Sequence, residues 1–202
     1  AKYFEGNFYH DLVPLIETVA PQLARAYTVE AWRKDRRRDS DTTKGFYQWS
    51  SMALTEYYQT QHTDRPWKNT ELMGDYVVAM AHWIVHEHQI LNRRRNTGYA
   101  YEGIIAAHQV ATARGLSHIA DALRNVTQVG LYQLTTWQVS GPLADQNPFL
   151  VQQQQRHDKP DPLAAGGVMN AKDDALLRID TTQHQMHAVM MALEEQLYET
   201  NR

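Results

Sequence analysis

The sequence predicts an all-α protein. Through most of its 202 residues, apolar side chains recur three and four positions apart, which is the spacing of amphipathic helices. Alternation of apolar and polar residues over more than four positions, the mark of a strand, is absent. We expect one domain over residues 1–202, complete or part of a larger unit, since this length is ample for a hydrophobic core.

Three helices are predicted in the first half of the chain, over residues 21–38, 43–61 and 69–91. In the first of them apolar side chains gather on one face, and the run Arg36 to Arg38 suits the negative end of a helix dipole. Residues 39–42 are Asp, Ser, Asp and Thr, which supply N-cap oxygens for the second helix.

Three more helices are predicted over residues 97–114, 116–139 and 179–199. Gly115 stands between the first two, where a tight turn favours a residue that tolerates positive φ. Residues 140–177 read as a long irregular loop. Loops of this length are usually lids or binding loops, or they are disordered.

An internal repeat links these helices. Three segments begin with glycine and continue with aromatic and polar residues: Gly6–His10, Gly45–Trp49 and Gly98–Glu102. A fourth segment, Ile179–Gln183, lacks the glycine but keeps the register. Apolar residues stand three and five positions after the end of all four segments. Each of the first three segments is expected to begin the first helix of an αα-hairpin, and the fourth begins a lone final helix, so the chain is predicted to repeat this hairpin.

Stacked αα-hairpins can form an open superhelix or curl into a ring, and a ring tolerates loops of unequal length better. At Asn96–Ile105, Gly45–Trp49 and Arg178–His184 the sequence resembles the α/α-toroid superfamily, which includes six-hairpin glycosidases, N-acylglucosamine epimerase-like proteins, glucuronyl epimerases and some polysaccharide lyases. The resemblance implies a partial or complete α/α toroid, with a substrate cleft where the inner helices start. Because a full toroid has more hairpins than this chain supplies, it also implies further hairpins or a partner chain that closes the ring.

Composition excludes several classes of protein. The formal net charge is −3 and the pI is near 6.4, which argues against nucleic-acid binding through bulk positive charge. Every apolar run is shorter than the roughly 20 residues that span a bilayer. Cysteine is absent, so disulfides, thiolate metal sites and cysteine nucleophiles are excluded, and no cofactor is expected. The chain begins at Ala1, which fits signal cleavage or a piece of a longer protein and favours a periplasmic or secreted location.

The candidate catalytic residues are Glu102, His184 and Asp180. A carboxylate among tyrosines, such as Glu102, can act as a general acid or base, although an acid in a first helical turn also simply stabilises the helix dipole. Asp180, Gln183, His184 and His187 are spaced to share one helix face, with Asp180 as the N-cap. Histidine suits proton transfer near neutral pH, and the alternative is a set of caps and buried hydrogen bonds.

The candidate substrate-binding residues are expected beside the same cleft. They are Trp49, Tyr99, Tyr101, Arg178, Gln183 and His10. Aromatic rings with a polar tip stack on sugars and fill helix interfaces equally well. Arg178 could pair with Glu102 or hold a substrate carboxylate through two hydrogen bonds. His10 is also a candidate acid or base.

His82 and His86 stand four residues apart, a spacing that can chelate a metal, and His88 follows closely. The order of these residues differs from the zinc-binding motif His-Glu-x-x-His, and their helix is assigned to the outer layer. We therefore expect a histidine pair without metal. The arginine runs 36–38 and 93–95 are expected to be solvated helix ends.

Together these observations predict a carbohydrate-directed domain that binds or acts on an acidic or N-acylated polysaccharide, by hydrolase, lyase or epimerase chemistry. A non-catalytic helical scaffold or protein-interaction domain, attached to a separate catalytic unit, is the alternative. A third class, a metalloprotein that uses the histidines at 82, 86 and 88, predicts a bound metal that a chelator removes.

Overall fold

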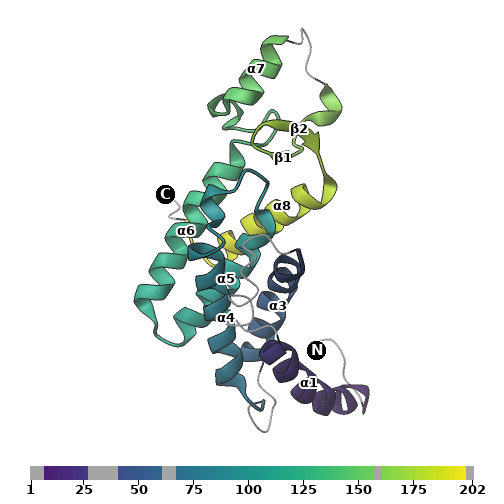
Figure 1. Ribbon diagram of the computed structural model, residues 1–202, viewed down its shortest axis with the longest axis vertical. Coiled ribbons are helices and arrows are strands. Elements are labelled where there is room, and N and C mark those ends of the chain that lie inside the picture. Colours follow the sequence, from purple (N-terminus) through teal and green to yellow (C-terminus); the bar gives the residue numbers. More distant parts are fainter. Residues whose placement is uncertain (1–6, 27–40, 61–66, 157–160, 199–202) are drawn as a thin grey trace.

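The protein is mostly helical, as the sequence predicted (Figure 1). The computed structural model describes residues 7–26, 41–60, 67–156 and 161–198, and for residues 7–11 and 41–43 it describes the backbone alone. The elements, in chain order, are α1 (Asn7–Ala26), α3 (Asp41–Gln59), α4 (Thr70–His86), the 3-10 turn η1 (Ile90–Asn92), α5 (Gly98–Ala113), α6 (Ser117–Thr135), η2 (Ala144–Gln146), α7 (Pro148–Arg156), η3 (Pro162–Ala164), β1 (Met169–Ala171), β2 (Asp174–Leu177) and α8 (Ile179–Glu194).

Helix α1 differs from the prediction of a helix that starts at Pro21. Proline lacks an amide hydrogen and is favoured in a first helical turn, which is why it suggested a start. Instead, α1 begins at Asn7, within the first repeat segment, and continues through Pro14 and Pro21. The arginines at 36–38 and the cap residues at 39 and 40 lie outside the described residues.

The other five predicted helices are present as α3, α4, α5, α6 and α8, and their starts agree with the prediction to within two residues. Three of them, α4, α6 and α8, end four or five residues early. Helix α6 ends before Gln138, which pairs with Val168 in an isolated bridge. For α4 and α8 the backbone explains the difference, because Gln89 and Gln196, which lie inside the predicted helices, take φ values of 56° and 53°. A left-handed residue cannot continue a right-handed helix.

Helices α3, α5 and α8 run in the same direction. The Tyr47 hydroxyl donates to the Ala100 carbonyl (3.0 Å) near the start of α3 and α5, and Thr55 donates to the Ala106 carbonyl (3.4 Å) further along both helices. At the far end of α5 the Gln109 amide donates to Glu195, just after α8 (2.8 Å). The starts of the three helices therefore meet at one end of the bundle.

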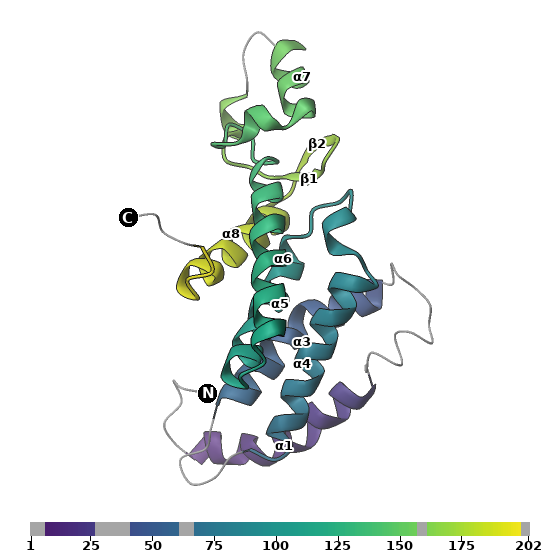
Figure 2. The ribbon, with the colours of Figure 1, turned by 90° about the vertical axis from the view of Figure 1, so that its left-hand side faces the viewer.

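Helices α4 and α6 return in the opposite direction. Ser50, at the middle of α3, contacts Met80 in the second half of α4, whereas Tyr58, near the end of α3, lies against Gly74 near the start of α4. In the same way Tyr101, early in α5, lies against Gly130 late in α6. The pairs α3–α4 and α5–α6 are therefore antiparallel hairpins. Helix α5 lies at the centre of the bundle (Figure 2), and 12 of its 16 residues are buried. No helix among the described residues is both long and apolar enough to cross a membrane.

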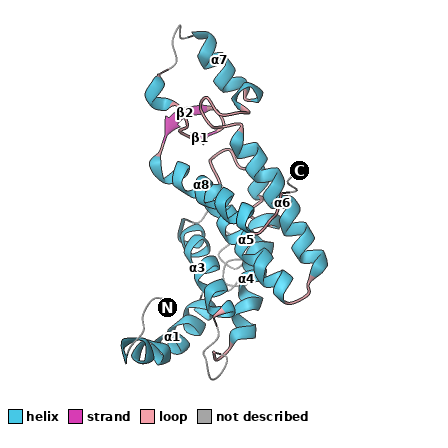
Figure 3. Ribbon diagram, turned by 180° about the vertical axis from the view of Figure 1, so that it is seen from behind, coloured by secondary structure: helices cyan, strands magenta, loops and turns pink. Residues whose placement is uncertain are grey.

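The segment 140–177 is not irregular, which corrects the sequence prediction. It contains α7, two 3-10 turns and a two-stranded antiparallel sheet that pairs Met169 with Leu177 and Ala171 with Asp174 (Figure 3). Strands of three and four residues are too short for alternation to reveal them. An isolated β-bridge pairs Ala171 with Arg95, just before α5, and another pairs Val168 with Gln138, just after α6. These bridges place β1 beside the start of α5 and the end of α6.

Candidate functional site

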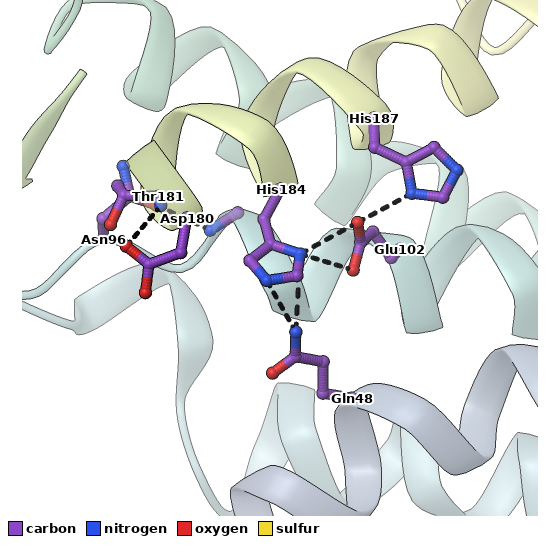
Figure 4. A network of polar contacts seen from close by, with 8 residues as sticks. Gln48, Asn96, Glu102, Asp180, Thr181, His184 and His187 are labelled. Carbon is purple, nitrogen blue, oxygen red and sulfur yellow. Dashed lines mark hydrogen bonds and ion pairs between the residues drawn. The ribbon is translucent and has the colours of Figure 1, made fainter. Parts of the chain in front are cut away.

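A buried carboxylate held by two imidazoles lies where α5 meets α8 (Figure 4). Glu102 is 1% exposed. The Nδ1 atom of His184 lies 3.1 Å from both carboxylate oxygens, and the Nδ1 atom of His187 lies 2.8 Å from Oε1. The amide nitrogen of Gln48 lies 2.8 Å from Nε2 of His184 and 3.4 Å from Nδ1, so it is close to both ring nitrogens.

These contacts define where the His184 proton sits when the ring is neutral. An ionised carboxylate only accepts hydrogen bonds, so His184 Nδ1 carries the proton and donates it to Glu102. In this tautomer Nε2 is an acceptor, and the Gln48 amide is the donor that lies near it. The His184 side chain is 17% exposed and that of His187 is 49% exposed. Each ring therefore contacts the buried carboxylate and also reaches the protein surface.

Close packing at Gly98 and the hydrogen bonds of the Asn96 side chain hold this arrangement. A Cβ atom on Gly98 would lie 2.8 Å from the backbone nitrogen of Gln185, so only glycine lets α5 approach α8 this closely. The Asn96 side chain accepts from the Gly98 amide (2.8 Å) and donates to the Gln185 side chain (3.4 Å) and to the Met169 carbonyl (3.3 Å). The start of α5 is thereby tied to both α8 and β1.

Two adjoining polar cavities open beside His184. The smaller, of about 170 Å³, is lined by Gln48, Asn96, Tyr99, Asn170, Arg178, Asp180, Thr181 and His184. The larger, of about 840 Å³, shares four of these residues, namely Gln48, Asn96, Tyr99 and Asn170. Because Asn170 belongs to β1, the segment 140–177 contributes a wall of both cavities.

The structure brings together several of the residues predicted from sequence. Glu102 and His184 are in direct contact, although 82 residues separate them. Tyr99, Arg178 and Asp180 line the smaller cavity with His184. Trp49 is largely exposed, and its ring meets that of His184 edge-on, with centroids 6.2 Å apart. These residues come from the N-terminal halves of α3, α5 and α8, except Arg178, which immediately precedes α8.

Arg178 and Asp180 pair with each other instead of with Glu102. The guanidinium nitrogens lie 2.7 and 3.0 Å from the Asp180 oxygens, and this hydrogen bonding lowers the pKa of Asp180. Arg178 occupies the N-cap position, and Asp180 lies in the first turn, where it accepts from the Thr181 amide (2.9 Å). The prediction that Asp180 is the N-cap is therefore wrong, because the helix already begins at Ile179.

Two predicted binding residues, Tyr101 and Gln183, line neither cavity. Tyr101 is 1% exposed and packs against Gly130 in the core, so its ring has no free face for a sugar, and burial raises its pKa to about 12. Gln183 is exposed on α8 but lines neither cavity. The side chain of His10 lies outside the described residues.

The histidines of the metalloprotein alternative do not converge. The rings of His82 and His86 are exposed and lie 4.5 Å apart between centroids. His88 instead is buried and stacks on Trp83 at 5.3 Å, and Arg93 donates to its Nδ1 atom at 2.9 Å. Among the described residues, no group of three or more histidine, aspartate or glutamate side chains is arranged to hold a metal ion.

Sequence reasoning missed residues that supply much of the cavity wall. Gln48 stands inside the repeat segment that starts at Gly45, and the repeat could have marked it as a neighbour of the other helix starts. Asn96 immediately precedes a predicted helix start. Asn170 gave no signal, because its strand was not predicted. The arginines at 93–95 were assigned as solvated helix ends, yet they line the larger cavity.

Comparisons with protein families, with curated proteins and with solved structures found no match. The functional argument therefore depends on the geometry of the site.

Proposed function

We propose that this chain is a carbohydrate-directed domain of the α/α-toroid type that acts on an acidic or N-acylated polysaccharide. The observation that carries the proposal is the imidazole of His184, which lines a polar cavity while its Nδ1 atom is held by the buried carboxylate of Glu102. Parallel helices α3, α5 and α8, whose starts meet at this cavity, support the toroid-like placement of the site.

In the proposed reaction His184 transfers the proton. Its Nε2 lone pair takes a proton from the substrate once the substrate replaces the Gln48 amide as the partner of that atom. The imidazolium that forms is stabilised by Glu102, which accepts the hydrogen bond from Nδ1. Positioned proton transfer of this kind contributes roughly 100-fold to 10,000-fold to a rate.

The arrangement favours lyase or epimerase chemistry over hydrolysis. Glycoside hydrolysis normally uses two carboxyl groups that flank the scissile bond. Here Glu102 is committed to two imidazoles, and Asp180 is paired with Arg178. A carboxylate-supported histidine instead suits removal of a proton from a sugar carbon next to a carboxyl group. We assign Trp49 and Tyr99 to stacking on the sugar. We assign Arg178 to holding the carboxyl group of the sugar, which requires the substrate to replace Asp180 as a partner of the guanidinium.

The test is turnover of uronic-acid and amino-sugar oligosaccharides by the wild type and by Glu102→Gln and His184→Ala. We expect each variant to lose at least about 100-fold in kcat, because each removes part of the proton-transfer pair. His82→Ala, which changes an exposed histidine on α4, is the matched control and should retain full activity. Lyase activity should be followed by the double bond formed in the product, and epimerase activity by the uptake of deuterium from the solvent. Wild-type turnover that survives Glu102→Gln would contradict the proposal.

The second candidate is a non-catalytic scaffold or a domain that other hairpins complete, and exposed apolar side chains on α8 favour it. Ile179, Met186, Met190 and Leu193 are 89%, 59%, 50% and 57% exposed and recur at helical spacings. A face of this kind suits packing against another helix. If the chain turns over no oligosaccharide, and replacing Met186 and Met190 by Gln abolishes self-association or partner binding, the scaffold function is supported.

A further inference from the structure

The larger cavity is basic, although the chain as a whole carries a net charge of −3. Its wall contains the four cationic residues Lys44, Arg93, Arg94 and Arg95. None of the described lining residues is an aspartate or a glutamate. Positive charge is therefore concentrated at one concave place on an acidic protein, which is where an anionic group would be attracted.

The segment that carries these arginines is fixed by the fold. The Asn96 amide donates to the Asn170 carbonyl (2.8 Å), and the Lys172 amide donates to the Arg94 carbonyl (2.9 Å). Arg93 donates through Nε to the His88 carbonyl at 2.8 Å, so its guanidinium is held against buried structure. Positioning the cations in advance lowers the entropy that a ligand loses on binding.

Arg95 is the cation best placed to meet a ligand. It is exposed and lines the cavity, and its backbone bridges to Ala171 in β1. Within the described part of the chain, no carboxylate pairs with Arg95, whereas Arg94 pairs with Asp173. A guanidinium carries donors in a planar fork that matches a carboxylate or sulfate group through two hydrogen bonds.

The basic cavity is continuous with the cavity at His184. Both are lined by Gln48, Asn96, Tyr99 and Asn170, so these side chains face the two spaces at once. A chain of sugars with one unit at His184 would place a neighbouring unit in the basic cavity. This wall is polar apart from the ring of Tyr99, as expected for a saccharide with one aromatic contact.

From these observations we infer that the larger cavity is an anion subsite, in which Arg95 binds the carboxylate or sulfate group of the sugar unit next to the one at His184. The inference rests on the proposed function, because it takes the ligand to be a saccharide. It narrows the substrate class to polymers that carry anionic groups on adjacent units, and it excludes neutral N-acylated chains.

The test is isothermal titration calorimetry at low and high salt with three probes: a galacturonate tetrasaccharide, a chondroitin sulfate tetrasaccharide and neutral cellotetraose. Arg95→Ala removes the guanidinium, and Arg124→Ala removes an exposed arginine on α6 that lines neither cavity. We expect Arg95→Ala to weaken binding of an acidic probe at least about tenfold and to reduce its salt dependence, while Arg124→Ala binds like the wild type. Arg95→Lys should recover only part of the affinity, because ammonium lacks the planar fork.

Preference for the galacturonate or the sulfated probe identifies the anionic group. Equal binding of acidic probes by wild type and Arg95→Ala overturns the subsite, as does equal binding of cellotetraose, or binding of no acidic probe. The failure of the catalytic proposal looks different. If acidic probes bind through Arg95 but are never converted, the subsite stands and the catalytic proposal fails. If Glu102 is needed for turnover while Arg95→Ala has no effect, the catalytic proposal stands and the subsite fails.

Discussion

Replacement of Gly98 by alanine should separate the two helices that form the site. The new Cβ would lie 2.8 Å from the nitrogen and 3.1 Å from the Cα of Gln185, where ordinary contact begins at 3.4 Å. Because both contacts are with backbone, α5 and α8 must move apart by about 0.6 Å, since a packed interior offers no free space. That movement stretches the 3.1 Å contacts between His184 and Glu102 to about 3.7 Å, beyond hydrogen-bonding range.

Overpacking of this kind costs roughly 1–3 kcal/mol of unfolding free energy. We would measure that free energy by urea unfolding, and the site itself by the NMR signals of the histidine rings. Gly45→Ala is the matched control, because Gly45 lies in α3 and no atom is within 4 Å of the position that the alanine methyl group would take. That control should be neutral or stabilising by up to about 1 kcal/mol. The reasoning is refuted if Gly98→Ala is as stable as Gly45→Ala and leaves the His184 ring signal unchanged.

Two further predictions concern the core. A Cβ on Gly130 would lie 1.9 Å from the Tyr101 hydroxyl oxygen. We therefore expect Gly130→Ala to lower the free energy of unfolding by about 3 kcal/mol, measured with urea. Stability close to that of the wild type would show that Tyr101 does not pack against Gly130. His108 is buried without a hydrogen-bond partner for either ring nitrogen among the described residues, and burial, then Arg124, lowers its pKa. Below about pH 6.5 His108 binds a proton in the unfolded chain but not in the folded protein, so the free energy of unfolding decreases as the pH falls. We expect His108→Leu to reduce this pH dependence, measured by urea unfolding at a series of pH values. A pH dependence equal to that of the wild type would contradict the prediction.

The helices and one half of the site were predictable from sequence because their signals are local. The spacing of apolar residues follows from the 3.6-residue turn of a helix, and five predicted helices are present. Glu102 and His184 were selected because each stands near the start of a predicted helix among polar or aromatic residues. In the predicted repeat Glu102 corresponds to Gln183, the neighbour of His184, and this led us to expect both residues at the same end of the fold.

The missed features depend on contacts that sequence spacing does not encode. Pro21 suits a helix start in isolation, but the chain on both sides of it is helical. Arg178 could reach several carboxylates, and the geometry of the first turn of α8 selected Asp180. Tyr99 and Tyr101 look alike in sequence. They differ by two positions on a helix, so one ring faces the cavity and the other the core.

The sequence alone determined that this protein is helical and where most of its helices begin, and it selected Glu102 and His184 as candidate residues. These are properties of short stretches of chain, fixed by backbone hydrogen bonding and side-chain periodicity. Only the tertiary structure decided that Glu102 holds two histidines, that Gly98 permits this contact, and that Arg95 faces a cavity. Those properties depend on which side chains meet across the fold, because close packing allows few arrangements of the same helices.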